Sequence, residues 1–391
     1  MRRLLLVVFL LLVLLCGFLG RRAYKHPLAV HEIQAVLVEQ DAPIASLVKG
    51  LDELHAVSHP LILRCVLNLL YKKDSLKAGE YDVHPGESIH ALIVRIQAGK
   101  VVRHHFLIVE GWTIQRVLDN MAKTPSFQQT LGTNTTGLMS RLGLKERHAE
   151  GLFFPDTYLY RRGASDKQIL LMAYHKMQQV LGDAWKHRAK GLAYNSPYKA
   201  LIAASLIEKE TARAKERPLI AAVINNRLRK GMRLQIDQSV VYGLHLPYGS
   251  TLTRSMLKKP TPYNVYLNKG LPPTPISLPS KASIVAACHP AKSKVLYYVV
   301  RGDGTQQFST TYKGQKLAVR ALRHREAEER LGLPTLKAFR ELACVSLATW
   351  DWLGGKKKAQ KLTISDTVVP FFCHQKEARA VSTWYHQVLT H

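Results

Sequence analysis

The sequence predicts an α+β protein that begins with an N-terminal transmembrane helix and continues as a small α/β module and a larger α+β domain. Three observations carry this prediction. An apolar run stands between basic residues at the N-terminus, short alternating segments indicate strands, and several helical segments start at N-cap residues. The chain of 391 residues is long enough to form more than one core.

The N-terminal segment predicts a short cytoplasmic stub and a transmembrane anchor over residues 1–25. Residues 4–19 form an apolar run, Arg2 and Arg3 precede it, and more basic residues follow it. As a helix the run would span roughly 24 Å, somewhat less than a hydrocarbon core of about 30 Å. A cleaved signal peptide is the alternative, but the run lacks the small-residue pattern of a cleavage site. We therefore expect an uncleaved anchor, with the rest of the chain outside the cytoplasm.

Residues 30–105 predict the small α/β module. Alternation of apolar and charged residues indicates strands, and two helical segments lie between them. The expected elements are a strand at 35–38, helices at 44–54 and 60–70, a strand around 81–83, and a helix that Ser88 caps. The pattern fits a spacer domain and a glycan-binding module equally well, so both interpretations stay open.

Residues 106–330 predict the larger α+β domain. A strand at 106–109 leads to Thr113, which is placed to cap a helix, and further helices are expected at 165–181, 196–210 and 217–229. The segments 295–300 and 307–311 predict a hairpin. The aromatic residues Phe153, Phe154 and Tyr158 fit either a sugar-stacking platform or a hydrophobic core. Residues 331–391 form a C-terminal extension to which the sequence assigns no role.

Composition limits the partners that the chain can bind. The formal net charge of +28 predicts an anionic environment, such as nucleic acid, an anionic membrane or an acidic polymer. Specific nucleic-acid binding is not expected, because the basic residues are dispersed and no helix-turn-helix or zinc pattern occurs. The five cysteines include no C-x-x-C and the histidines no H-E-x-x-H, so we expect neither a metal nor a cofactor.

Glu208 is the candidate acid that the residue pattern itself indicates. On a helix it shares a face with residues that are small and mostly apolar, namely Leu201, Ala204, Ser205, Thr211 and Ala212. Poor solvation favours the neutral carboxyl, which is the form that a general acid needs. The alternative is a solvated surface residue. Glu210 points elsewhere on the helix and is expected to stay ionised in a salt bridge.

The segment around this glutamate resembles a known catalytic motif. Residues 204–211, Ala-Ser-Leu-Ile-Glu-Lys-Glu-Thr, resemble the catalytic segment of the endolytic murein transglycosylases, the MltG/YceG-like family. Other segments agree in order: 110–113, 150–158, 223–228, 231–237, 241–243, 263–266, 270–276 and 286–291. The chain departs from the family where it reads Ile236-Asp237-Gln238 instead of threonine-aspartate-proline, and where Asn225-Asn226 replaces a single asparagine.

This resemblance covers roughly residues 30–325 and implies a function. It implies a single span in the cell inner membrane, a LysM-like domain at 30–105, and a periplasmic catalytic domain at 106–330 with Glu208 as the catalytic acid. The implied reaction cleaves the bond between N-acetylmuramic acid and N-acetylglucosamine in nascent peptidoglycan strands. It leaves a 1,6-anhydro end and terminates glycan elongation. Peptidoglycan synthases are the partners that the family suggests.

Four further residues in these motifs are our candidates for holding sugar amides and hydroxyls, namely Gln235, Asp237, Tyr263 and Asn264. A turn is the alternative role for the last two. Two other functions stay open. One is a peptidoglycan hydrolase on the same scaffold, with Asp237 or Asp156 as a second carboxylate. The other is a non-catalytic cell-wall-binding protein in which residues 30–105 do the work.

Overall fold

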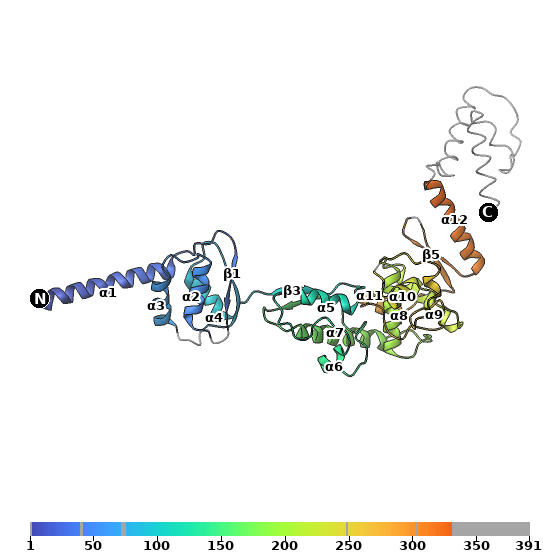
Figure 1. Cartoon of the computed structure of the whole chain (residues 1–391), viewed down its shortest axis with the longest axis horizontal. Helices are drawn as coiled ribbons and strands as arrows, with labels where there is room; N and C mark the ends of the chain where they lie inside the picture. Colours follow the sequence, from blue (N-terminus) through green and yellow to red (C-terminus); the bar gives the residue numbers. More distant parts are fainter. Residues whose placement is uncertain (1, 40–41, 72–75, 248, 302, 331–391) are drawn as a thin grey trace, which may run out of the picture. The chain divides into compact units, whose positions relative to one another are not determined.

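The computed structural model describes residues 2–39, 42–71, 76–247, 249–301 and 303–330. The C-terminal extension at 331–391, to which the sequence assigns no role, lies outside these described residues. Figure 1 shows the elements in chain order from helix α1 to helix α12 (Tyr312–Arg330). The described part is a mixed α+β protein whose strands form three two-stranded antiparallel sheets. This agrees with the predicted α+β class.

The apolar N-terminal run lies within helix α1 (Arg2–Lys25). Near its C-terminal end, this helix packs against helix α3 (Pro60–Leu70). The packing is close at Gly20, where an added Cβ would lie 3.0 Å from a methyl carbon of Val66. Among the helices in the described part of the chain, none is both long enough and apolar enough to cross a membrane.

The small module follows the predicted order of elements. Its parts are β1 (Gln34–Val38), α2 (Ile44–Glu53), α3, β2 (Gly79–Val83) and α4 (Ile89–Ala98). Strands β1 and β2 pair antiparallel, and the fully buried Tyr81 faces Val36 across the pair. Ser88 caps α4 as predicted, because its side chain accepts a hydrogen bond from the backbone N–H of Ala91. The module has its own hydrophobic core, which includes Leu47, Leu51, Leu63, Leu67 and Ile93.

The first half of the larger domain pairs two distant strands. Its elements are β3 (His104–Leu107), α5 (Ile114–Ala122), α6 (Leu138–Leu142), β4 (Thr157–Tyr160) and α7 (Asp166–Lys186). Strand β3 pairs with β4, which brings Phe106 opposite Tyr158. Phe153, Phe154 and Tyr158 are all buried in the core of this domain. The core interpretation of these aromatic residues is therefore confirmed, and the sugar-stacking interpretation is wrong.

The second half of the domain is built around helix α8. It contains α8 (Pro197–Glu210), α9 (Arg217–Arg229), α10 (Asp237–Gly243), the 3-10 helix η2 (Met256–Lys258), α11 (Lys281–Cys288), β5 (Tyr297–Val300) and β6 (Gln306–Ser309). Ser196 caps α8 and Pro197 is its first residue, as predicted. Every residue from 200 to 207 is buried, because α9, α10 and α11 all pack against α8 (Figure 1). The sequence did not predict α10 or α11.

Candidate functional site

Glu208 lies in the last turn of α8, where the buried part of the helix reaches a cleft. Its side chain is only 7% exposed, so the alternative of a solvated surface residue is wrong. The neighbours Leu201, Ala204 and Ser205 on the same helix are fully buried, as the helical periodicity predicts. The surroundings are less apolar than expected, however, because other segments bring polar groups to the carboxyl.

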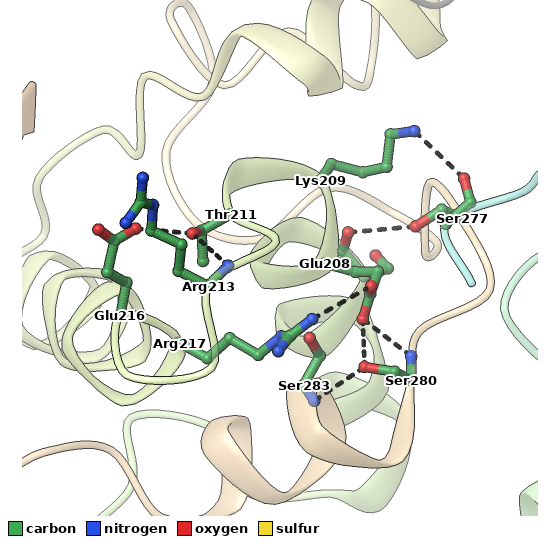
Figure 2. A network of polar contacts seen from close by, with 11 residues as sticks. Glu208, Lys209, Thr211, Arg213, Glu216, Arg217, Ser277, Ser280 and Ser283 are labelled. Atoms are coloured by element: carbon green, nitrogen blue, oxygen red, sulfur yellow. Dashed lines mark hydrogen bonds and ion pairs between the residues drawn. The ribbon is translucent and has the colours of Figure 1, made fainter. Parts of the chain in front are cut away.

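Ser280 supplies the closest polar contacts of Glu208. The Ser280 backbone N–H and hydroxyl both donate to Oε2 of Glu208, at 2.9 and 2.5 Å (Figure 2). Ser280 is also the N-cap of α11 and accepts a hydrogen bond from the backbone N–H of Ser283. The carboxyl therefore lies at the N-terminal end of α11, where unpaired backbone N–H groups favour negative charge. These contacts fix the orientation of the Glu208 side chain.

Arg217 faces the other oxygen of Glu208. Its Nη2 lies 3.8 Å from Oε1, and its Nε is buried without a hydrogen-bond partner among the described residues. Arg217 is the first residue of α9 and is 9% exposed. A buried donor without a partner costs free energy, so an acceptor that reached this nitrogen would stabilise the site.

A hydrogen-bonded loop between α8 and α9 sets Arg217 across from Glu208. The Thr211 hydroxyl donates to Oε2 of Glu216 at 2.7 Å and accepts from the backbone N–H of Arg213 at 3.0 Å (Figure 2). The other oxygen of Glu216 accepts from the backbone N–H of Gln306 at 2.8 Å. The loop is thus tied to strand β6, which limits the movement of Arg217 relative to α8.

The cleft next to Glu208 has a volume of about 770 Å³. That is within the usual range of ligand sites, about 300–1,000 Å³. Its walls come from the segment 109–113, the end of α8, the start of α9 and helix α10. Besides Glu208, the lining residues include Glu110, Trp112, Arg116, Arg217, Gln238 and Tyr242. The site is therefore a cleft of ligand size with a sheltered carboxyl in its wall.

Glu110 is a second acid in the wall of this cleft. Burial and the nearby charge of Glu208 raise the pKa of Glu110, and Arg217 opposes the rise. The next residue, Gly111, has φ of +75°, and an added Cβ there would lie 3.8 Å from Cγ of Glu208. The positive φ favours glycine at this position, while the distance to Glu208 is an ordinary van der Waals contact. The sequence motif at 110–113 pointed to this segment, but it did not identify Glu110 as a candidate acid of the site.

A buried network below the cleft connects three of its walls. Glu150 is 5% exposed and accepts hydrogen bonds from the Ile114 backbone N–H at 3.1 Å and the Tyr242 hydroxyl at 3.2 Å. Burial raises the pKa of Glu150 to about 8. Lys209 donates to the Gly111 carbonyl at 3.2 Å, and burial lowers its pKa. Glu150 thus connects α5 with α10, and Lys209 connects α8 with the segment that precedes α5.

Glu210 does not occupy the salt bridge that its helix position predicted. Its Oε2 accepts a hydrogen bond from the Tyr298 hydroxyl at 2.8 Å, and the described residues place no cation in an ion pair with it. Burial and, to a smaller extent, the nearby charge of Asp237 raise the pKa of Glu210 to about 7, although the hydrogen bond from Tyr298 opposes the rise. The expectation of a fully ionised residue in a salt bridge is therefore wrong, because strand β5 covers this face of the helix.

Gln235 and Asp237 do not line the cleft. The side chain of Gln235 accepts a hydrogen bond from Nη1 of Arg227 at 3.3 Å, and its backbone φ is +50°. Asp237 begins α10 and accepts a hydrogen bond from the Tyr266 hydroxyl. Their neighbours Gln238 and Tyr242 reach the cleft instead. The substrate-binding role of the two predicted residues stays a prediction that this geometry does not support.

Tyr263 and Asn264 are also outside the cleft lining. The Tyr263 hydroxyl is 2.8 Å from the Thr274 hydroxyl, and its ring packs edge-on against that of Tyr242, with 4.9 Å between centroids. Asn264 has no exposed surface. Its amide donates to the carbonyls of Leu257 and Lys259 and accepts from the backbone N–H of Tyr266. This is the arrangement of a structural turn, the alternative role named above.

Asp156, proposed as a second carboxylate, also lies away from Glu208. It is paired with Lys176 and lines a different depression. No group of three or more histidine, cysteine, aspartate or glutamate side chains in the described ranges could hold a metal ion.

The residues that the structure adds to the site are Ser280, Arg217 and Glu110. Arg217 had a local signal in the sequence, since it stands at the start of a predicted helix, whereas Ser280 begins α11, which the sequence did not predict.

The fold and site define an α+β protein with a sheltered, hydrogen-bonded acid, Glu208, in the wall of a cleft of ligand size. The chain matches the model of the YceG-like family over residues 36–321 and therefore belongs to this family. It is 35% identical over 164 residues to an endolytic murein transglycosylase of Bacillus subtilis, covering 42% of this chain and 45% of that one. It is 27% identical over 265 residues to one of Streptococcus pneumoniae, covering 57% and 46%.

The chain thus matches less than half of the length of either relative. Among solved structures it resembles a putative yceG-like protein of Listeria monocytogenes. That comparison has 28% sequence identity and a TM-score of 0.47, and covers 73% of this chain and 99% of the other.

Proposed function

We propose that this protein is an endolytic lytic transglycosylase that cleaves peptidoglycan glycan strands. The bond cut is the one between N-acetylmuramic acid and N-acetylglucosamine, and the product carries a 1,6-anhydro end. The observation that carries the proposal is the position of Glu208, a side chain 7% exposed in the wall of a cleft of about 770 Å³. Membership of the YceG-like family and the names of the two relatives support the choice of substrate.

The hydrogen bonds of Glu208 indicate which of its oxygens can face the substrate. Both Ser280 groups donate to Oε2, so this oxygen acts as an acceptor. A proton transferred to the substrate therefore has to come from Oε1, the oxygen on the Arg217 side. Oε1 protonates the glycosidic oxygen, and positive charge develops at C1 of the muramic ring. The carboxylate that forms is stabilised by Arg217 and by the N-terminus of α11.

The same carboxylate completes the reaction as a base. It takes the proton of the muramic 6-hydroxyl, whose oxygen closes onto C1 and gives the 1,6-anhydro ring. A nucleophile within the substrate has a high effective concentration, so the reaction needs no activated water. One carboxyl can therefore serve as acid and then as base, whereas a hydrolase uses two.

The test is the product of purified peptidoglycan digestion with the wild type and with Glu208→Gln. The amide cannot transfer the proton, so we expect a loss of at least about 100-fold in rate, the usual scale of general acid catalysis. Mass spectrometry of the wild-type product should show anhydro ends. An active Glu208→Gln variant would reject the assignment. Binding without cleavage by the wild type would favour the non-catalytic wall-binding protein.

A hydrolase is the rival reaction, and the geometry changes its candidate second carboxylate. Asp156 and Asp237 do not line the cleft next to Glu208, whereas Glu110 does. A hydrolase on this scaffold would use Glu110 to activate water. Digestion in water enriched in ¹⁸O separates the two reactions, because hydrolysis places the label at the new end and ring closure does not.

The sequence also supports a proposal about location. We propose that the N-terminal run anchors the chain in the cell inner membrane, with the catalytic part in the periplasm. The described large side chains of the run, among them Leu10, Leu14 and Phe18, are 58%, 64% and 62% exposed. Exposed apolar side chains of this kind fit a membrane partner. Extraction from bacterial membranes by detergent, but not by alkaline carbonate, is the expected result.

The small module supports one further proposal. Its strand–helix–helix–strand order fits a LysM-like domain, and a pull-down of residues 1–105 with insoluble peptidoglycan tests glycan binding.

We also propose that the protein contacts peptidoglycan synthases. Cleavage beside a synthase would terminate the elongation of the strand. The test of this contact is co-purification from membranes after cross-linking.

A further inference from the structure

A second depression lies beside the cleft and shares two residues with it. Its volume is about 840 Å³, and Glu110 and Arg217 line both spaces. Its lining includes the exposed face of α11, with Lys281, Ala282 and Val285, and also Phe154 and Asp156. Arg217 also faces Glu208, so a long ligand that extends past Glu110 and Arg217 would occupy both spaces.

The side chains of this depression suit an amphipathic and acidic ligand. Val285 is 40% exposed although it lies on a packed helix, and it provides an apolar surface for the C–H face of a sugar ring. Lys281 is exposed one residue after Ser280 and forms no ion pair within the described residues. The negative charge of Asp156 is already balanced by Lys176. The other ionisable side chains that line the depression are Glu110, His289 and Arg217.

Arg217 gives the second, independent sign of a ligand. It is 9% exposed, and its Nε has no hydrogen-bond partner among the residues that the structure describes. A buried guanidinium with an unused donor favours an anionic acceptor. Lys281 and Arg217 line the same depression, so both cations face the same bound ligand.

We propose that this second depression binds the part of the glycan strand beyond the cleaved bond, and that Lys281 and Arg217 bind a carboxylate carried by a muramic residue there. This inference rests on the proposed function of Glu208. The carboxylate comes either from the stem peptide or, where the peptide has been removed, from the lactyl group. The strand therefore occupies both spaces, with the cleaved linkage beside Glu110 and Arg217.

The experiment compares Lys281→Ala and Val285→Asp with the wild type in steady-state cleavage of long glycan strands. Loss of one exposed cation weakens binding moderately, so we expect Lys281→Ala to raise KM by about three- to tenfold with kcat unchanged. Val285→Asp should raise KM as well, because it places a negative charge beside the strand. Lys230→Ala is the matched control, since Lys230 is exposed at the opposite end of α9 from Arg217.

Three substrates identify the source of the carboxylate. If Lys281→Ala raises KM only for strands with stem peptides, the peptide supplies it. If KM also rises for strands freed of peptide, the lactyl group supplies it. Neutral chito-oligosaccharides carry no carboxylate, so Lys281→Ala should not change their affinity, which is measured as their inhibition constant in competition with the glycan strand. Unchanged KM in both variants with unchanged kcat would overturn the proposal while Glu208 keeps its role. Inactivity of the wild type would instead overturn the proposed function itself.

Discussion

Ser280 donates two hydrogen bonds to a single oxygen of Glu208, one from its backbone N–H at 2.9 Å and one from its hydroxyl at 2.5 Å. The two residues are 72 positions apart in the sequence. Ser280 is also the N-cap of α11, so the same residue begins a helix and orients the candidate acid. This relationship leads to the first prediction.

Ser280→Ala should lower kcat by about tenfold, the effect expected from losing one charge-assisted hydrogen bond of about 1.5 kcal/mol. The backbone N–H remains, so the activity should not fall to that of Glu208→Gln. Loss of the N-cap should also lower the free energy of unfolding by about 1 kcal/mol. Ser196→Ala is the matched control, because it removes the N-cap of α8 without touching Glu208. If both variants lose the same activity, Ser280 acts through stability alone.

Glu110→Gln tests the second acid of the cleft. If the Glu110 carboxylate stabilises the positive charge that develops on the sugar, the variant should lose about ten- to 100-fold in kcat. The pKa of Glu110 is raised, mainly by burial, so the wild type should lose activity as the pH falls through that raised value. The variant should lack this acidic limb of the pH profile. Glu146→Gln serves as a control, since Glu146 accepts a hydrogen bond from Tyr174 and lines neither space.

The product that Glu110→Gln forms shows whether the enzyme is a transglycosylase or a hydrolase. A transglycosylase keeps its anhydro product in Glu110→Gln, at a lower rate. A hydrolase that uses Glu110 to activate water would lose its ¹⁸O-labelled product. An unchanged rate and an unchanged pH profile would show that Glu110 is not part of the reaction.

Glu150→Gln should alter how stability depends on pH. Burial raises the pKa of Glu150 to about 8 from the usual 4.5, so the folded protein holds this proton more tightly than the unfolded chain. The stabilisation is fully present below the unfolded pKa and is lost as the pH rises through the folded pKa, at about 1.4 kcal/mol for each pKa unit. The amide does not titrate, so the variant lacks this loss.

The measurement is urea unfolding of both proteins near about pH 5 and about pH 9, on either side of the titration. The wild type should lose more free energy of unfolding than the variant between these two values. Other titrating groups are common to both proteins, so the difference between them reports Glu150. Equal losses would mean that Glu150 does not hold a proton in the folded state.

Asn264→Ala should destabilise the fold without weakening substrate binding. The change removes an amide that bonds three backbone groups, two of them carbonyls, and each group left unsatisfied in a buried position costs about 1–3 kcal/mol. KM of the folded variant should equal that of the wild type. Asn268→Ala is the control, because Asn268 is exposed and donates to a single carbonyl. A raised KM in a variant of normal stability would restore the substrate-binding role predicted from the motif.

Much of the local structure follows directly from the sequence. Ser88, Thr113, Ser165 and Ser196 each cap a helix where a capping residue precedes apolar periodicity, because the capping bond is made within three residues. Short contacts of this kind do not depend on the rest of the fold. The helices α10 and α11 gave no such clear signal, because they are short and α11 is nearly apolar on most faces.

The sequence by itself determined that Glu208 lies in the last turn of a helix whose neighbouring residues are small and buried, because a helical period fixes which residues share a face. Only the tertiary structure decided what meets that carboxyl. Ser280, Arg217 and Glu110 come from three other segments, and strand β5 supplies the tyrosine that replaces the expected salt bridge of Glu210. These contacts depend on how separate elements pack around α8, and no local pattern encodes that packing.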